Sequence, residues 1–568
     1  MPIPSRLNRW IPMIAWKTGR GLTLLLLLSL ITGCGGGDSA EAPAADADYG
    51  DPVPGGTAII AEGADMSIPL VIVAQTAFDG NLGGDVMYRS MFATDWEDGR
   101  LVYMTADESP MAIARSYEFL GADSASLRFH LRSDLRWSDG HPITAEDFVF
   151  TFGILADPEL ASPVQNYADD LVSVEAENDS TVVFHFTRRY PEMFTHVSLQ
   201  PLPAHIFSGT PPGQLRNHPT IRNPENGNLV VSGPYMIGSW ERGERVVLVR
   251  NPEFEPQPYL DQLVFRIVPE PLTRLVELQT GAVDVVTGIT LDQLPRLRQQ
   301  APHVRIELEE KRFYDYIGYN GERFEPFADP EIRRALGLAI DVPRIISSLQ
   351  MDEFAVPAGG PYPPIFRDLY DPEGQAPLPY DPDEARRILE SKGWRDTNGD
   401  GILDRDGRPF SFTLMTNSGN QRRADVSQIV QEQWRRIGVQ ANIQIREFNT
   451  MMENLTSGEY DAALSGWSVG LYPDLTTLWA PDSPFNHTRF SDPEVSRLIE
   501  EARRKPTYEE AAPVWREAAS RISEAQPYTW LYYLDQVDGV NQRLRGVEID
   551  TYGPYQNTWE WWIPEELR

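Results

Sequence analysis

The sequence predicts a mixed α/β protein, and three observations lead to that fold class. Short segments in which apolar and polar residues alternate, as in β-strands, are separated by segments with apolar residues at helical spacing. Apolar residues make up 41% and charged residues 23% of the 568 residues, which is enough for a large packed core. No period of about 20–50 residues recurs, which excludes a solenoid or a propeller. At about 150 residues per domain, the length predicts two to four structural units.

The first 33 residues have the pattern of a secretory signal peptide. Their Arg and Lys residues, with no acidic residue among them, come before the apolar run Leu22–Ile31. Such a run is about 16 Å long as a helix, too short for a bilayer core of about 30 Å. Ile31-Thr32-Gly33-Cys34 resembles a bacterial lipobox, and Cys34 is the one cysteine of the chain. We therefore expect Cys34 to become a lipidated N-terminus that anchors the protein to a membrane, the alternative being an ordinary signal peptide that ends near a cysteine.

Residues 34–54 consist mainly of Gly, Ala, Asp and Pro and predict a flexible tether, because they hold too little apolar surface to offset the entropy of ordering. The expected location is therefore extracytoplasmic, in the periplasm or at the cell surface. The formal charge of −33 repels phosphate backbones and excludes nucleic acid as a partner. A single cysteine also excludes an intrachain disulfide and a Cys-ligated metal cluster.

Five segments read as strands because they alternate at period two or are rich in β-branched residues between Gly and Pro. They are Thr57–Ala61, Leu127–Arg132, Thr181–Thr187, Arg245–Arg250 and Leu263–Val268.

Four helices are predicted from their capping residues. Thr144 precedes one helix, with Asp147 three residues on. Asp329 and Asp492 each precede a proline at the first helical position, followed by an apolar stripe. A fourth stripe runs over residues 426–437 and ends at Gly438, the residue type that closes a helix in the left-handed conformation.

Five sequence blocks, in order, resemble the peptide/nickel class (family 5) of solute-binding proteins of ABC transporters. Each block by itself resembles the family only over a short stretch. Together, the resemblance runs from about residue 55 to the C-terminus. The blocks are Leu127-Arg-Phe-His-Leu-Arg-Ser-Asp-Leu-Arg-Trp-Ser-Asp-Gly-His-Pro-Ile-Thr-Ala-Glu-Asp-Phe-Val-Phe150, Ser232-Gly-Pro-Tyr235 with Arg250-Asn-Pro252, Tyr316-Ile-Gly-Tyr-Asn320 with residues 329–341, Tyr380–Gly393, and Tyr460-Asp-Ala-Ala-Leu-Ser-Gly-Trp467.

The resemblance implies a periplasmic-binding-protein-like clamp (type II, cluster C) of two lobes, with an extra subdomain in the first lobe. Lobe one would comprise residues 55–307 and 535–568, and lobe two residues 308–534. A solute would bind between the lobes and stabilise the closed form, because only that form contacts it from both sides. The protein would then deliver the solute to an ABC permease. We expect a monomer that needs no cofactor and catalyses nothing.

Gly466 and Trp467 align with a Gly-Trp pair in the wall of the family's cleft. The glycine would let the backbone approach the ligand, and the indole would stack on it. Family members that bind peptides usually carry, two or three residues after this tryptophan, an aspartate that pairs with the ligand's α-ammonium. This chain has Val469 and Gly470 there, and Asp474 lies farther on. The departure weakens the case for peptides with a free N-terminus and leaves open oligosaccharides, blocked peptides and other polar solutes.

Seven further residues are candidate ligand contacts, because they lie in blocks that line the family's site or, for Asp65, in the loop after the first strand. For each, a role in packing or in a turn is the alternative. They are Ser232, Tyr235, Tyr88, Asp65, Tyr316, Asn320 and Tyr532.

Residues 396–404 match part of a calcium loop. Asp396, Asn398, Asp400 and Asp404 supply oxygen at positions 1, 3, 5 and 9, and a glycine occupies position 6. Position 12, normally a bidentate acid, is Gly407. A weak structural Ca²⁺ is one expectation, and an Asp/Asn/Gly-rich turn is the other.

An extracytoplasmic lipoprotein hydrolase is the alternative from a different functional class. The eight histidines form no His-Glu-x-x-His motif, and the chain has neither a Gly-x-Ser-x-Gly elbow nor a phosphate-binding Gly-x-x-x-x-Gly-Lys loop. The sequence therefore favours a binding protein.

Overall fold

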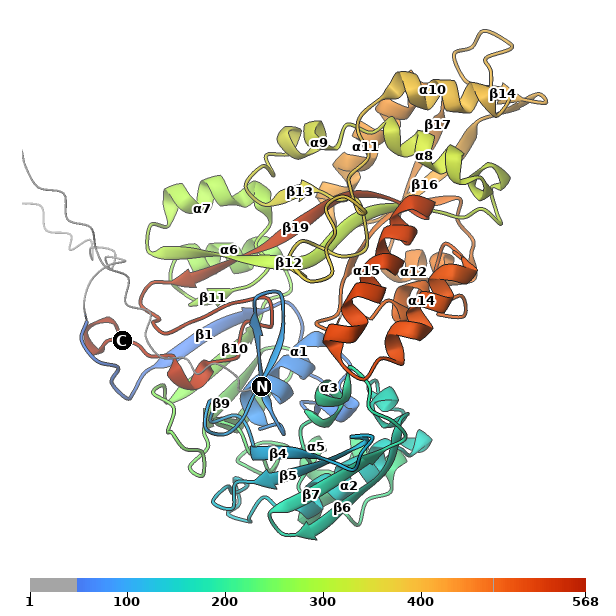
Figure 1. Cartoon of the computed structure of the whole chain (residues 1–568). Coiled ribbons are helices and arrows are strands. Elements are labelled where there is room, and N and C mark those ends of the chain that lie inside the picture. Colours follow the sequence, from blue (N-terminus) through green and yellow to red (C-terminus); the bar gives the residue numbers. More distant parts are fainter. Residues whose placement is uncertain (1–48, 473) are drawn as a thin grey trace, which may run out of the picture. The chain divides into compact units, whose positions relative to one another are not determined.

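A mixed sheet of eleven strands dominates the computed structural model, which describes residues 49–472 and 474–568 (Figure 1). Its order is β17-β16-β18-β12-β19-β11-β1-β10-β9-β8, with β13 paired to β19. The strands are β1 (Thr57–Glu62), β8 (Tyr235–Glu241), β9 (Arg245–Arg250), β10 (Gln262–Ile267), β11 (Val285–Val286), β12 (Val304–Tyr319), β13 (Ala355–Pro357), β16 (Ser411–Asn417), β17 (Gln440–Arg446), β18 (Ala462–Ser468) and β19 (Tyr528–Asn541).

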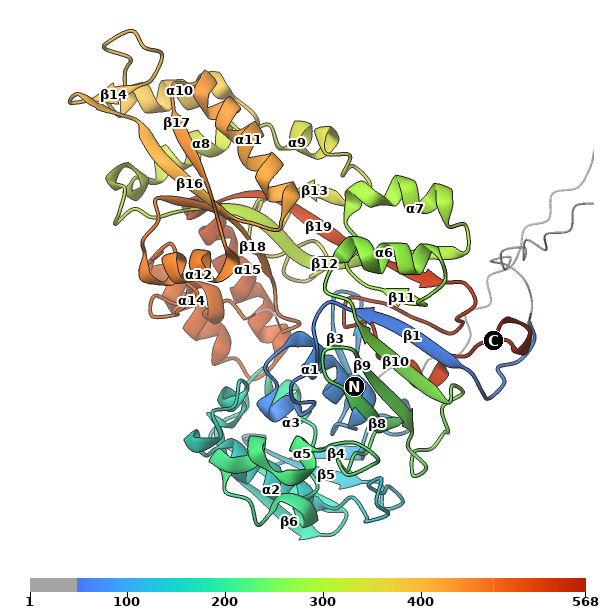
Figure 2. The same cartoon turned by 180° about the vertical axis from the view of Figure 1, so that it is seen from behind.

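The antiparallel pair β12 and β19 joins the two halves of this sheet (Figures 1 and 2). Strand β19 pairs with β11 of one half, and β12 pairs with β18 of the other half. The register shifts between Glu309 and Phe313 of β12, where the opposing residues pass from Gln536 to Leu534. The predicted lobe boundaries at 307/308 and 534/535 fall in these strands, beside the shift.

All described residues belong to one compact unit, so the division into lobes stays a prediction. We use lobe one for residues 55–307 and 535–568 and lobe two for residues 308–534.

A second, antiparallel sheet lies within lobe one, in the order β4-β5-β7-β6. Helix α2 (Ala145–Leu155) packs against β6 and β7, and Phe152 meets Phe184 edge-on, with ring centroids 5.0 Å apart. This sheet and helix are the extra subdomain implied by the resemblance. The strands are β4 (Ala114–Leu120), β5 (Ser126–Leu131), β6 (Leu171–Asn178) and β7 (Thr181–Phe186). Two small hairpins pair β2 (Ala93–Glu97) with β3 (Arg100–Met104) and β14 (Asp404–Arg405) with β15 (Arg408–Pro409).

The remaining helices pack around these sheets. Those of lobe one are α1 (Ala77–Asn81), α3 (Met193–Val197), α4 (Ala204–Phe207), α5 (Pro219–Arg222), α6 (Pro271–Gln279) and α7 (Leu294–Gln300). Those of lobe two are α8 (Pro330–Leu338), α9 (Val342–Ser348), α10 (Pro382–Ser391), α11 (Gln421–Arg436), α12 (Phe448–Ser457), α13 (Thr476–Trp479), α14 (Pro493–Arg503) and α15 (Tyr508–Ala525).

The predicted strands and helices are confirmed. Each of the five strands is present, with its ends shifted by at most one residue. Asp329 accepts a hydrogen bond from the Glu331 amide at 2.9 Å, and Asp492 likewise caps α14. Gly438 follows α11 with φ +84°, as a glycine cap requires. Local capping chemistry therefore fixes these boundaries.

Each lobe has its own core. The largest buried cluster lies in lobe one, and two others fill lobe two. In lobe two, Trp434 of α11 is fully buried and packs on Phe412 of β16, while its indole N–H donates to the Leu336 carbonyl at 2.9 Å. Burying a side chain of this size stabilises the fold by about 2–3 kcal/mol or more.

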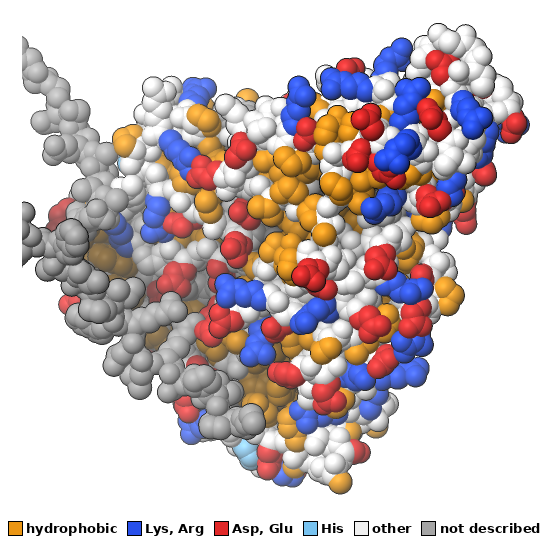
Figure 3. All heavy atoms as spheres, turned by 45° about the horizontal axis from the view of Figure 1, so that its top comes forward, with side chains coloured by type: hydrophobic (Ala, Val, Ile, Leu, Met, Phe, Trp, Pro, Cys, Tyr) orange, Lys and Arg blue, Asp and Glu red, His pale blue; other side chains and the backbone are white. Residues whose placement is uncertain are grey.

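The surface carries both signs of charge despite the net excess of acid. Figure 3 shows acidic and basic side chains intermixed on the face that it displays. The net charge is therefore not gathered into one acidic patch on this face.

Candidate functional site

Trp467 lies on β18, directly opposite Tyr314 of β12. Its indole N–H donates to the Tyr528 hydroxyl at 3.2 Å, and the ring meets Phe485 edge-on with centroids 6.0 Å apart. The side chain is half-buried. One part of the indole is thus held by the protein, and another stays accessible to a ligand.

A pocket of about 270 Å³ lies beside this indole. Its volume is just below the range of about 300–1,000 Å³ that suits a drug-sized ligand, so it fits one side chain or one terminus of a larger solute. Its walls are mostly aromatic or aliphatic. The lining residues are Pro361, Tyr362, Trp467, Ser468, Val469, Gly470, Tyr472, Asp474, Leu475, Thr477, Leu478, Trp479 and Phe485.

Asp474 provides the carboxylate of this pocket. It accepts hydrogen bonds from the Thr476 amide at 3.0 Å and from the Thr476 hydroxyl at 2.8 Å. Burial raises the pKa of Asp474, although the bonds to Thr476 oppose this. In the described part of the chain it makes no ion pair with a Lys or Arg side chain. The sequence left its reach open, and the structure places it in the same pocket as Trp467.

Glu192 directly precedes α3 in lobe one and lies close enough to Asp474 of lobe two for the two charges to interact. Burial, and then repulsion from Asp474, raise the pKa of Glu192 to about 7. The lobes touch at this edge, because Arg188 donates from Nη1 to the Arg503 carbonyl at 2.8 Å. No motif marked Glu192, since its importance comes from a contact between distant segments.

Gly466 leaves room for an internal ion pair. A Cβ atom at this position would overlap the Asp315 carboxylate and the Arg423 guanidinium. Close approach of a ligand to its backbone stays a prediction. Asp315 contacts Arg422 Nη2 at 2.9 Å and Arg423 Nη2 at 2.8 Å. Burial works against ionisation, but the two guanidinium groups lower the pKa of Asp315 to about 2.

Tyr316 and Tyr532 lie near Trp467 as supports. Tyr316 is buried and stacks on Tyr528, with ring centroids 3.8 Å apart, and Tyr528 in turn accepts the indole N–H. Tyr532 is fully buried and donates its hydroxyl to Asp315 at 3.0 Å. The structure thus brings these predicted residues together with Trp467 behind the pocket wall.

Three predicted residues of lobe one lie in its core. The Tyr88 hydroxyl donates to the Val230 carbonyl at 3.1 Å, and Ser232 Oγ accepts from the Arg89 amide at 2.9 Å. The Tyr235 hydroxyl donates to a main-chain carbonyl at 3.4 Å. All three are almost fully buried. The structure gives them the packing and turn roles that were the alternative, and solute contact stays a prediction for them.

Asp65 and Asn320 also have partners within the protein. Asp65 accepts from the Trp240 indole at 2.9 Å and from the Gly243 amide at 2.7 Å. Asn320 is buried and donates to the Gly458 carbonyl at 2.9 Å. Both side chains tie loops together, and the structure does not bring them into the pocket beside Trp467.

A second pair of interacting carboxylates, missed by the sequence analysis, lies in lobe one. Burial, and then repulsion from Asp550, raise the pKa of Asp85 to about 8. Arg312 lies near Asp550 and donates to the Val469 carbonyl at 2.8 Å, and burial lowers its pKa to about 10. These groups come from three distant segments and share no sequence signal.

The predicted calcium loop is an internally bonded turn. Asp396 accepts from the Gly399 amide at 2.7 Å, and Asp400 accepts from the Ile402 amide at 2.8 Å. Asp404 is buried and bonded to Thr397. Asn398 accepts from the Asp400 amide at 2.9 Å. The oxygen atoms are therefore engaged by the loop itself, and the three carboxylates do not gather as a ligand set.

A larger pocket of about 620 Å³ lies elsewhere in lobe two, between Tyr319 and Arg521. Three of its charged side chains have partners within the protein. Arg521 pairs with Asp492 at 3.0 Å, and Arg333 donates to the Gln526 carbonyl at 2.7 Å. We place the candidate site at the smaller pocket, because Trp467 and Asp474 both line it.

Cys34, the signal peptide and most of the tether lie outside the described residues. Within the described part of the chain, no helix is long and apolar enough to cross a membrane.

Comparison with known proteins gives one family. The profile described as "Bacterial extracellular solute-binding proteins, family 5 Middle" matches residues 110–488. The chain is similar to the oligopeptide-binding protein AppA of Bacillus subtilis, with 26% identity over 565 residues that cover 95% of this chain and 98% of that relative.

Two solved structures share the fold. The structure of B. subtilis AppA in complex with a nonapeptide aligns with a TM-score of 0.72 and 25% identity, covering 90% of this chain and all of that one. The ABC transporter substrate-binding protein CtaP from Listeria monocytogenes aligns with a TM-score of 0.76 and 23% identity, covering 90% of this chain and all of that one.

Proposed function

Since this chain belongs to family 5 of the bacterial extracellular solute-binding proteins, we propose that it captures an oligopeptide-like solute between its lobes and delivers it to an ABC importer. Membership makes the chain a transport binding protein and not an enzyme. Its similarity to oligopeptide-binding AppA over nearly its whole length supports a peptide as the solute.

The observation that carries the proposal is the pocket beside Trp467 and Asp474. Its aromatic walls offer stacking surfaces, and Asp474 offers a negative charge to a ligand cation such as a peptide α-ammonium. The carboxylate that the sequence lacks at positions 469 and 470 would thus be supplied from position 474. A pocket of this size would hold one residue of the peptide, while the rest would lie between the lobes.

Closure of the lobes would complete the site. The bend would occur in β12 and β19 at their register shift, where the regular pairing is broken. A bound peptide would contact Asp474 from lobe two and Glu192 from lobe one, and its positive charge would relieve the repulsion between these carboxylates. The closed form would then be favoured by the ligand's contacts with both lobes.

Anchoring through Cys34 forms part of the same proposal. The lipidated cysteine and the tether of residues 35–54 would hold the protein on the outer side of a membrane, next to the permease. Cys34→Ser should move the protein from the membrane fraction to the soluble fraction without changing peptide affinity. Retention of the variant in the membrane fraction would contradict the lipobox interpretation.

Isothermal titration with a peptide panel tests the function. We expect at least one oligopeptide to bind, and Trp467→Ala to weaken it about tenfold or more, since a stacked aromatic contributes about 1 kcal/mol beyond its burial. Trp562→Ala, at a half-buried tryptophan outside the pocket, is the matched control and should leave the affinity unchanged. Binding of oligosaccharides but of no peptide would overturn the peptide assignment, and hydrolysis of the panel would overturn the transport assignment.

A further inference from the structure

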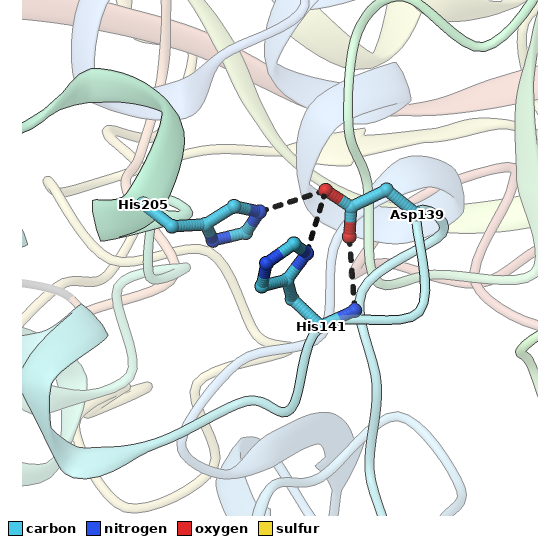
Figure 4. A group of neighbouring side chains, drawn as sticks. All are labelled: Asp139, His141 and His205. Atoms are coloured by element: carbon cyan, nitrogen blue, oxygen red, sulfur yellow. Dashed lines mark hydrogen bonds and ion pairs between the residues drawn. The ribbon is translucent and has the colours of Figure 1, made fainter.

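Asp139, His141 and His205 form a cluster on lobe one (Figure 4). Within residues 49–472 and 474–568, this is the one group of three such side chains whose potential metal-ligand atoms all lie within 4.8 Å of one another. His205 Nε2 lies 2.8 Å from Asp139 Oδ2, and His141 Nδ1 lies 3.3 Å from the same oxygen. Two imidazole nitrogens thus converge on one carboxylate.

The two rings are held in parallel. Their centroids are 4.1 Å apart and their planes differ by 18°, so the nitrogens that face Asp139 leave from the same side of the stack (Figure 4). Asp139 is also fixed, because its Oδ1 accepts from the His141 amide at 3.1 Å.

A single buried residue, Asp147, ties the two segments of the cluster together. Asp139 and His141 sit in the turn after Trp137, and the Trp137 indole N–H donates to Asp147 Oδ2 at 3.2 Å. His205 is on α4, and the amide of Ala204 before it donates to Asp147 Oδ1 at 2.8 Å. The cluster is thus preassembled by the fold, which lowers the cost of binding an ion.

The spacing of these atoms suits a small divalent ion. Tetrahedral Zn²⁺, with bonds of about 2.0–2.1 Å, places its ligand atoms about 3.3 Å apart. The His141–Asp139 separation of 3.3 Å matches this value, and the His205–Asp139 separation of 2.8 Å is shorter, so His205 would have to move outward slightly to admit the ion. Imidazole nitrogen suits Zn²⁺, Ni²⁺ and Cu²⁺, whereas Ca²⁺ and Mg²⁺ prefer oxygen alone.

We propose that Asp139, His141 and His205 bind a divalent transition-metal ion of the Zn²⁺, Ni²⁺ or Cu²⁺ class on the surface of lobe one. Three protein ligands leave one position for water, or for a donor from a binding partner. The exposure of the His141 side chain, which is 59% accessible, lets an ion enter from solvent. The site is separate from the pocket beside Trp467, and none of its residues lines that pocket.

Isothermal titration of the EDTA-treated and dialysed protein with Zn²⁺ tests the proposal. We expect one Zn²⁺ per chain, and at least about tenfold weaker binding in His141→Asn and in His205→Asn, since even the outer partners of metal ligands contribute about 10–100-fold. His130→Asn is the matched control, because His130 is also exposed and lies 4.0 Å from the single carboxylate of Glu118. This control should bind Zn²⁺ as the unchanged protein does.

A second measurement guards against misfolded variants. Zn²⁺ should raise the melting temperature of the unchanged protein and of His130→Asn, but not that of the exposed-site variant His141→Asn, whose circular dichroism should match the parent. No Zn²⁺ heat at millimolar concentration would overturn the proposal. So would equal binding by the parent and both cluster variants, which would leave the Asp–His hydrogen bonds as a purely structural link.

Discussion

Two sets of carboxylates, one paired with arginines and one without an ion pair among the described residues, differ in their pKa values. Asp315 is bonded to two arginines and a tyrosine hydroxyl, and its pKa falls to about 2. Asp474 and Glu192 lie close enough for their charges to interact, and the pKa of each is raised, that of Glu192 to about 7. The first set satisfies its charge within lobe two. The second set makes no ion pair within residues 49–472 and 474–568, and burial raises both of its pKa values.

The difference has a simple physical origin. A carboxylate taken out of water loses hydration that only a nearby cation and hydrogen bonds can replace. Asp315 receives both from the protein, whereas Asp474 receives hydrogen bonds from Thr476 but no ion pair within the described part of the chain. Raised carboxyl pKa values in a pocket are therefore a mark of a functional site, and a lowered one beside two arginines is a mark of structure.

The largest expected effect is on the free energy of unfolding, when Asp315 is separated from its two arginines. Asp315→Asn leaves two guanidinium groups without their counter-charge and should lower the free energy of unfolding by about 3–5 kcal/mol, measured by urea titration. Glu432→Gln, which removes an exposed pair with Arg436, is the control and should change it by less than about 0.5 kcal/mol. A fully stable Asp315→Asn would show that the pair does not support the wall behind Trp467.

The raised pKa of Glu192 should make the free energy of unfolding fall as pH rises. Because the pKa of Glu192 is about 7 in the folded protein and 4.5 in its ordinary state, the folded form binds more protons between these values. The free energy of unfolding should thus decrease from pH 4.5 to pH 7, by up to about 3 kcal/mol from this group.

Glu192→Gln should remove this part of the pH dependence and be the more stable protein at pH 8, as measured by urea titrations across that range. Glu432→Gln, at an exposed carboxylate, should follow the parent curve. A Glu192→Gln curve that coincides with the parent's would contradict the raised pKa of Glu192 in the folded protein.

The smallest expected effect is on the affinity for a peptide. Asp474→Asn should weaken a peptide with a free α-ammonium by about 10–100-fold, the worth of a charge-assisted hydrogen bond, and should leave its N-acetylated form unaffected. Isothermal titration of both peptides with both proteins measures this. Equal losses for the two peptides would mean that Asp474 shapes the pocket without recognising the amine.

Local structure and family were predictable, whereas the details of the site were only partly so. The capping residues Thr144, Asp329 and Asp492 predicted helix starts, since capping depends on neighbours within a few residues. The Gly466–Trp467 pair led to the proposed pocket, and its contact with a solute stays a prediction. The space that Gly466 leaves for the Arg423 side chain was not predictable, because that side chain comes from a helix 43 positions earlier in the sequence.

The sequence by itself determined the α/β class, the start of individual helices and strands, and the resemblance that led to a solute-binding protein. These depend on periodicity, capping and ordered motifs, all of which are local. Only the tertiary structure decided which charged side chains meet each other. Asp315 with Arg423, Asp474 with Glu192, and His141 with His205 are each brought together by folding across long stretches of chain, which no local sequence pattern records.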